Sequence, residues 1–130
     1  ALQKRRQEIA ERARLSREAL IAGNRENQPN WSEDERGPWA MAKQQVSPHV
    51  AGAFLERRPP WRETAAGIQC PALLITADVD KGAIVSPEMA AEAKELNPRI
   101  EVAPIAGAGH NVRRDAFEPY LEAVRAFLSQ

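Results

Sequence analysis

Two residues in the C-terminal half have the chemistry of an acid and histidine pair. Asp80 lies in a polar turn directly after an apolar run, residues 72–77, and His110 lies in a small-residue turn after a second extended run, residues 99–105. Imidazole exchanges protons near neutral pH, and a carboxylate can hold it in one tautomer and stabilise its protonated form. The pattern therefore indicates a catalytic histidine and a catalytic acid, which from the residues alone is either Asp78 or Asp80.

A strand, helix and strand are needed to bring these two turns together. Residues 72–76 are continuously apolar, which is typical of a strand covered on both faces. Ser86 and Pro87 have the pattern of an N-cap and first helical residue, and the helix that they open should end near Leu96. Two parallel strands joined in this way place their carboxyl ends at one sheet edge, where ligands bind in open α/β sheets.

The remaining segments are predicted to be helical. An amphipathic helix is expected over residues 115–128, with a buried stripe made of Phe117, Leu121, Val124, Phe127 and Leu128. The first half has the pattern of helices over residues 1–27, 33–46, 47–55 and 61–68, with Ser32 and Ser47 as N-caps and no convincing strand. The composition changes near Gly67, so we place a boundary between residues 1–67 and residues 68–130.

The overall composition gives no support to several classes of partner. The 18 basic and 18 acidic residues balance, which favours neither nucleic acid nor an acidic membrane surface as a partner. No apolar run approaches the ~18 residues of a membrane span. Cys70 is the single cysteine, so we expect a buried structural thiol, a reducing compartment and a cytoplasmic protein. No metal-ligand spacing and no glycine-rich phosphate loop occurs, so we expect neither a metal nor a cofactor.

These features, in this order, resemble the C-terminal portion of α/β-hydrolase-fold enzymes. In that family the acid commonly closes a strand as Leu-x-Ile-x-Gly-x-x-Asp, and residues 73–80 read LLITADVD, with Ala77 in place of the glycine. The histidine commonly follows Gly-x-Gly before the last helix, and residues 107–110 read GAGH. The resemblance covers residues 70–130. It implies that Asp80 is the catalytic acid and His110 the catalytic base.

The resemblance also implies a role for the helical first half. Many such enzymes insert a helical cap before the acid-bearing strand, and residues 1–67 are interpreted as this cap or lid. Its large apolar side chains would either line a substrate pocket or pack the cap itself; they are Trp31, Trp39, Met41, Phe54 and Trp61. His49, in the first turn of a cap helix, is interpreted as an ordinary surface histidine.

The third member of a nucleophile–histidine–acid triad is missing. The nucleophile of this fold sits on a Gly-x-Ser-x-Gly elbow, and none of the serines has the flanking glycines: Ser16, Ser32, Ser47, Ser86 and Ser129. The chain begins with Ala1, and we expect it to be part of a nicked, split or truncated hydrolase that is inactive alone. An N-terminal segment or companion chain would then supply the nucleophile and oxyanion hole. The substrate expected is a small apolar acyl compound with an ester, lactone or similar bond.

A non-enzymatic alternative stays open at this point. Two strands make an incomplete sheet, and exposed strand edges tend to pair with another chain. The chain would then be a non-catalytic binding or oligomerising module derived from the same fold, and self-association into a homo-oligomer is one form of it. Arg113 and Arg114 beside His110 are interpreted either as contacts for an anionic substrate or as exposed arginines before a helix.

Overall fold

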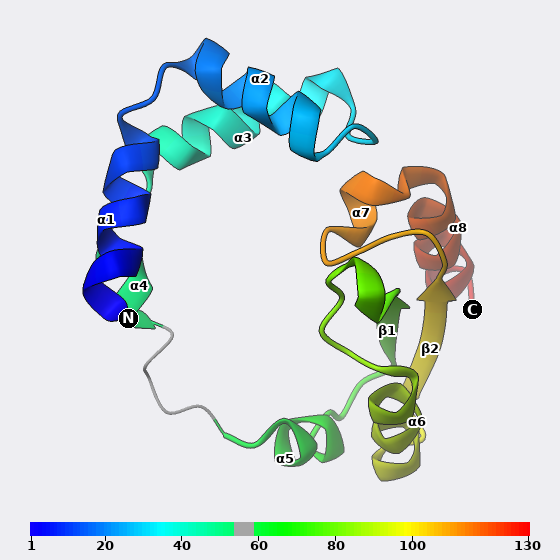
Figure 1. Ribbon diagram of the computed structural model, residues 1–130. Helices are drawn as coiled ribbons and strands as arrows, with labels where there is room; N and C mark the ends of the chain where they lie inside the picture. The colour runs from blue at the N-terminus through cyan, green and yellow to red at the C-terminus, as the bar shows by residue number, and fades with distance from the viewer. Residues whose placement is uncertain (54–58) are drawn as a thin grey trace. The chain divides into compact units, whose positions relative to one another are not determined.

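The computed structural model describes residues 1–53 and 59–130, which form two compact units (Figure 1). The first unit is Ala1–Arg58 and the second is Pro59–Gln130. In the described residues the first unit is entirely helical, and the second contains both strands. The sequence analysis drew its boundary after residue 67, whereas helix α5 (Trp61–Ala66) contacts helix α6 (Pro87–Leu96) of the second unit.

The first unit contains four described helices. They are α1 (Leu2–Ala13), α2 (Arg17–Asn27), α3 (Glu33–Gln45) and α4 (Val50–Ala53). The prediction of one helix over residues 1–27 was wrong, because the chain leaves the helix after residue 13 and Ser16 starts a new one. The Ser16 hydroxyl accepts a hydrogen bond from the Ala19 amide at 3.1 Å, which satisfies a free donor at the start of α2.

Helix α3 largely follows its prediction. Ser32 is its N-cap, although its hydroxyl accepts from the Asp34 amide at 3.3 Å and not from the amide of Glu35, and the helix continues through Pro38. Among the expected apolar contacts, Trp31 is 5% exposed and meets Trp39 edge to face. Met41, which was interpreted as lining a pocket or packing the cap, is 51% exposed. The helix predicted for residues 47–55 is described as far as residue 53, so Phe54 and Leu55 lie outside the described residues.

A buried arginine joins α2 to α3. The Arg36 side chain is 3% exposed, and it donates hydrogen bonds to the Asn24 side chain, to the Gln28 carbonyl at 3.2 Å and to the Trp31 carbonyl at 2.9 Å. It also donates to the Glu33 carboxylate at 2.9 Å. The planar guanidinium therefore supplies donors to acceptors of the turn between the two helices, since it presents five N–H groups in one plane.

The Glu33 carboxylate also binds a second arginine. Arg25 donates to both of its oxygens, at distances between 2.6 and 3.1 Å. Hydrogen bonds from Arg25, and then from Arg36, lower the pKa of Glu33 from its ordinary 4.5 to about 2. The turn between α2 and α3 thus carries one carboxylate between an exposed and a buried guanidinium.

The second unit is built on two parallel strands. Strand β1 (Ala72–Ala77) pairs with β2 (Ile100–Ile105) in a register that joins Ala72 to Ile100 and Ala77 to Ile105. The remaining elements are the short helix η1 (Val79–Lys81), α6, α7 (Val112–Asp115) and α8 (Phe117–Leu128). The predicted strands and the helix capped by Ser86 are confirmed, and the Ser86 hydroxyl accepts from the Met89 amide at 3.2 Å.

The core of this unit lies on the face of the sheet that α6 covers, with α5 packed beside α6. Ala65, Ala93 and Ile100 are its buried residues, and alternate strand residues such as Leu74 pack beside them. Asn97, 3% exposed at the end of α6, holds this corner together. Its side-chain amide donates to the carbonyls of residues 65 and 68 at 2.9 Å each, and its carbonyl oxygen accepts from the amide of residue 99 at 3.0 Å.

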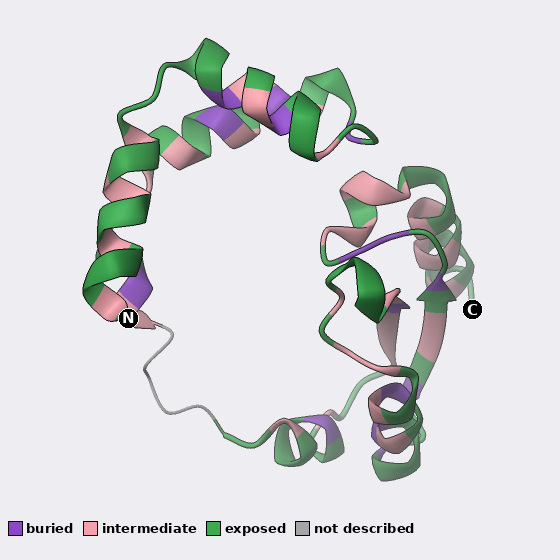
Figure 2. Ribbon diagram, in the orientation of Figure 1, coloured by how far each residue is buried: buried purple, intermediate pink, exposed green. Residues whose placement is uncertain are grey.

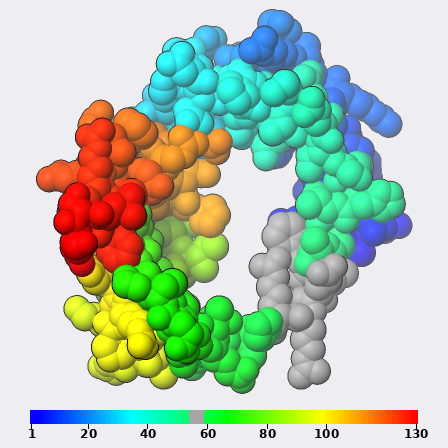
Figure 3. All heavy atoms as spheres, turned by 180° about the vertical axis from the view of Figure 1, so that it is seen from behind, coloured from blue at the N-terminus to red at the C-terminus, as the bar shows by residue number. Residues whose placement is uncertain are grey.

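The last helix is less buried than its sequence predicts. The helix expected over residues 115–128 is interrupted at Ala116, and α8 has no buried residue (Figure 2). Phe117 and Leu128, both assigned to the buried stripe, are 50% and 74% exposed. The side chains of this C-terminal segment, red in Figure 3, form part of the molecular surface. The apolar face of α8 is therefore only partly covered within the described residues.

Two further expectations concern single features of the chain. Cys70 was expected to be buried and is exposed, because it lies with Pro71 before the start of β1. Within the described part of the chain, no helix combines the length and the apolar character that crossing a membrane requires.

Replacing the buried arginine tests its role in the helical unit. We expect Arg36→Met to lower the free energy of unfolding by about 2 kcal/mol or more, because the buried Asn24 side chain and the buried Trp31 carbonyl lose their donor. The measurement is urea unfolding followed by circular dichroism. Arg25→Met removes an exposed arginine from the same carboxylate and is the matched control. Equal effects of the two variants would contradict the structural role of the buried guanidinium.

The lowered pKa of Glu33 predicts a pH dependence of stability. Its folded pKa of about 2 lies below its ordinary 4.5, so its stabilising effect is complete above about pH 4.5 and is lost as pH falls toward 2. The difference in thermal midpoint between the wild type and Glu33→Gln should therefore shrink across this interval. Glu26→Gln, on an exposed position of α2, is the control and should show no such trend.

Candidate active site

The two chemistry-bearing turns start from adjacent positions at one edge of the sheet. Ala77, the last residue of β1, pairs with Ile105, the last residue of β2. The acid turn, residues 78–83, follows β1, and the histidine turn, residues 106–111, follows β2. Because the strands are parallel, both turns leave the sheet at its carboxyl edge, as the sequence analysis expected.

Asp78 connects the acid turn to the histidine turn. Its amide donates to the Ala108 carbonyl at 3.0 Å, and its carboxylate oxygen Oδ2 accepts from the Gly107 amide at 2.8 Å. The same oxygen lies 3.4 Å from Nζ of Lys81. The Asp78 carbonyl accepts from the amides of Lys81 and Ala83 at 3.1 and 3.2 Å, which closes the acid turn on itself. The turn that bears the histidine is thus hydrogen-bonded to the turn that bears the acids.

Gly109 lets the two turns approach closely. A Cβ atom at this position would lie 2.2 Å from the Lys81 carbonyl oxygen, a distance at which no side chain fits. The Gly109 amide donates to Oδ2 of Asp115 at 2.9 Å, so the histidine turn is also held from α7. The small residues before His110 were expected to allow a close backbone approach, and the structure shows that the backbone approached is that of the acid turn.

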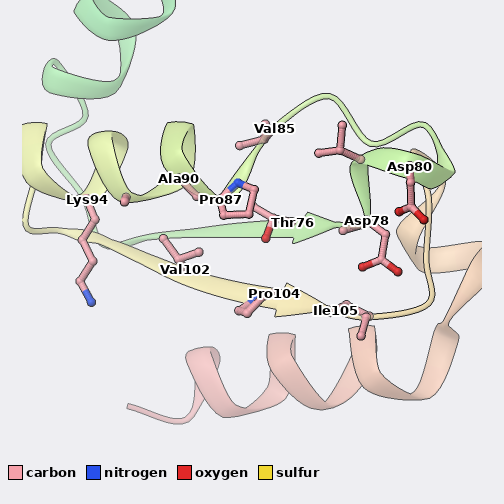
Figure 4. A pocket seen from close by; sticks show the side chains of 14 residues that line it. Thr76, Asp78, Asp80, Val85, Pro87, Ala90, Lys94, Val102, Pro104 and Ile105 are labelled. Atoms are coloured by element: carbon pink, nitrogen blue, oxygen red, sulfur yellow. The ribbon is translucent and has the colours of Figure 1, made fainter.

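Asp80 lies at the edge of a pocket on the sheet face beside α6. Figure 4 shows its carboxylate and that of Asp78 beyond the end of β1. The pocket has a volume of about 750 Å³, and its walls are mostly apolar side chains of the strands and α6, such as Val102 and Ala90. Asp80 is exposed and makes no side-chain hydrogen bond or ion pair among the described residues. Its carboxylate oxygens are thus available to an added group.

His110 lies on the other side of the sheet edge. It is exposed and lines a pocket of about 370 Å³ together with Ile75 of β1 and Tyr120 of α8. Within the described residues, no hydrogen bond joins the imidazole to Asp80 or Asp78. The structure therefore brings the two turns together, while the side chains of Asp80 and His110 border different pockets.

The serines and the second histidine considered in the sequence analysis show no catalytic arrangement in the described residues. The hydroxyls of Ser16, Ser32, Ser47 and Ser86 each accept a hydrogen bond from a backbone amide, and that of Ser129 donates to the Arg125 carbonyl. His49 is exposed, as expected. Among residues 1–53 and 59–130, no three His, Cys, Asp or Glu side chains gather as metal ligands.

Asp115 is a contributor to the site that the sequence analysis did not identify. It was counted as the first residue of the last helix, yet its carboxylate holds the amide of Gly109, directly before His110. A carboxylate six residues after a glycine has no distinctive signal, because the contact depends on how the chain folds back through α7. The one available signal for this contact was the presence of an acid five residues after His110.

Two solved structures are similar to this chain. One is an E-2-(acetamidomethylene)succinate hydrolase, with a TM-score of 0.70 and 20% identity over 88% of this chain. The other is an N-formylmaleamic acid deformylase from Pseudomonas putida, with a TM-score of 0.63 and 21% identity over 89% of this chain. The chain spans 46% of the length of each. No family model and no curated protein sequence matches it.

These likenesses define the class of fold. The chain has the C-terminal portion of an α/β-hydrolase fold, with two parallel strands, the helices that join and follow them, and a preceding helical segment. The fold expected from the acid-bearing and histidine-bearing strands is therefore confirmed. At this level of identity the likeness concerns the fold alone, so the chemistry has to be argued from the residues of this chain.

The contact at Gly109 provides a test of how the site is built. We expect Gly109→Ala to lower the free energy of unfolding by about 1–3 kcal/mol, because the added methyl group overlaps the Lys81 carbonyl. Thermal unfolding of the purified protein measures this effect. Gly23→Ala is the control: a Cβ there meets no atom within 4 Å, and alanine suits the interior of α2, so stability should be unchanged or higher. Equal stability of Gly109→Ala and wild type would disprove the close contact.

Proposed function

We propose that this chain supplies the acid and the histidine of an α/β-fold hydrolase whose nucleophile lies outside the chain. Asp80 would orient the imidazole of His110 and stabilise its protonated form, with Asp78 as the alternative acid. His110 would take the proton of the nucleophile and later give it to the leaving group. The observation that supports this role best is the pairing of Ala77 with Ile105, which starts both turns from neighbouring positions at one sheet edge.

The nucleophile and the oxyanion hole are proposed to come from an N-terminal segment or a companion chain. The serine hydroxyls described above are all bound to backbone groups, and the exposed Cys70 precedes β1, at the opposite end of that strand from the acid turn. The chain spans under half of each similar structure. The half-covered face of α8 is suited to packing against such a segment, since exposed apolar area favours association.

The bond that is cleaved is proposed to be an acyl bond of a small substrate. The pocket beside Asp80 is lined mainly by apolar side chains, which suits an apolar acyl group. By their names, the two similar structures act on an acetamidomethylene succinate and on an N-formyl amic acid. These names add amides to the esters and lactones considered first. The helical first part of the chain, residues 1–67, is proposed to be the cap of this fold.

A non-catalytic binding or oligomerising module is the second candidate. The exposed Phe117 and Leu128 of α8, together with a sheet of two strands among the described residues, favour it. In this case the apolar face would pair with another chain, a further copy included, without any hydrolysis. Intact-mass measurement on the protein purified from its native source separates the two candidates. A single 14 kDa species without hydrolase activity would favour the module.

The catalytic proposal is tested on the protein with its nucleophile-bearing part present. With a panel of small esters, lactones and N-acyl amides, we expect His110→Ala to lower kcat/KM by about 10³-fold or more. Asp80→Asn should lower it by a similar factor, because the imidazole loses its orienting charge. His49→Ala replaces the exposed histidine of the helical unit and should stay within about twofold of wild type. Full activity of His110→Ala would refute the proposal.

A further inference from the structure

We infer that the two aspartates of the acid turn have different tasks, and that Asp78 is a positioning residue for the histidine turn. Asp78 is hydrogen-bonded to that turn, whereas within the described residues no hydrogen bond joins Asp80 to it. This division of tasks deepens the proposed function and rests on it for the role of Asp80. The attachment of the histidine turn by Asp78 stands on the geometry alone.

Asp78 holds the histidine turn by both its backbone and its side chain. The Asp78 amide donates a hydrogen bond to the Ala108 carbonyl at 3.0 Å, three residues beyond Ile105, the last residue of β2. The carboxylate then accepts from the Gly107 amide at 2.8 Å. Gly107 has a φ of +83°, and the acceptor for the amide of this left-handed residue is the Asp78 carboxylate, in the turn directly after β1.

Lys81 contacts both Asp78 and the histidine turn. Its Nζ lies 3.4 Å from Oδ2 of Asp78, and its carbonyl oxygen lies against the Cα of Gly109, where a Cβ would be 2.2 Å away. Lys81 therefore contacts both the Asp78 carboxylate and the glycine that precedes His110. A shift of the histidine turn would disturb the hydrogen bond of Gly107 and the packing of Gly109 together.

The two aspartates differ in whether their carboxylate oxygens already have hydrogen-bond donors. Oδ2 of Asp78 faces two donors, the amide of Gly107 and the ammonium group of Lys81. An acid that orients an imidazole needs an acceptor available to the ring N–H. Asp80 makes no side-chain hydrogen bond or ion pair in the described residues, so its acceptors are available. One oxygen of Asp78 is thus committed to the Gly107 amide and Lys81, whereas neither oxygen of Asp80 is engaged by the described residues, which suits Asp78 to holding backbone and Asp80 to serving the histidine.

Amide hydrogen exchange tests the positioning role without reference to any reaction. By NMR on the intact protein, we expect Asp78→Ala to accelerate exchange of the Gly107 amide by about tenfold, the equivalent of one hydrogen bond. Asp78→Asn keeps an oxygen acceptor and should stay within about threefold of wild type. Lys81→Met is the matched control: it removes the ammonium group, leaves the hydrogen bond and should also stay within about threefold. Unchanged exchange in Asp78→Ala would overturn the inference.

Kinetics on the complete enzyme then separates positioning from catalysis. We expect Asp78→Ala to lower kcat by about tenfold with little change in KM, and Asp78→Asn to recover most of that loss. Asp80→Asn should lower kcat by about 10³-fold or more, because the amide keeps the shape of the acid but not its charge. If Asp78→Asn is as inactive as this variant, Asp78 is the catalytic acid and the inference fails.

The two experiments fail in distinguishable ways. If His110→Ala keeps full activity, the proposed hydrolase mechanism is wrong, and the assignment of Asp80 as acid falls with it. The exchange of the Gly107 amide would still report whether Asp78 holds the histidine turn. If exchange is unaffected by Asp78→Ala while His110→Ala is inactive, the mechanism stands and the positioning role is refuted.

Discussion

The parallel pairing of β1 with β2 is the constraint on which the rest of the second unit depends. Equal strand lengths and a register that ends Ala77 opposite Ile105 make both connections leave the sheet at the same level. An antiparallel pair would put the two turns at opposite ends. The crossover through α6 is what makes the parallel arrangement available, since parallel strands need a long connection. Asn97 holds the end of that crossover against the backbone that enters β1.

Local sequence signals were sufficient for the elements that follow from local physics. The apolar run of β1 and the Ser86 cap of α6 appear in the structure as predicted. The signals fail where distant contacts decide. Arg36 reads as an ordinary surface charge, yet it is buried, because the turn between α2 and α3 folds over it. A serine at position 16 inside good helix formers gave no warning that it would start a new helix.

The candidate site shows the same division. Asp80 and His110 were predicted because a strand end followed by an acid, and a Gly-x-Gly-His turn, can be recognised in the sequence. The hydrogen bonds that organise them are between residues about thirty positions apart, such as Gly107 and Asp78. The predicted stripe of α8 is partly wrong for a related reason: amphipathic spacing reports which face is apolar, and burial depends on what packs against it.

The contacts between the two turns lie wholly within the second unit, Pro59–Gln130. This has a consequence for the order in which a complete site would form. Backbone that is already held in one conformation loses no further conformational freedom when another segment joins it. The acid and histidine turns would thus serve as a rigid template, and the conformational search at assembly would be confined to the incoming nucleophile-bearing segment.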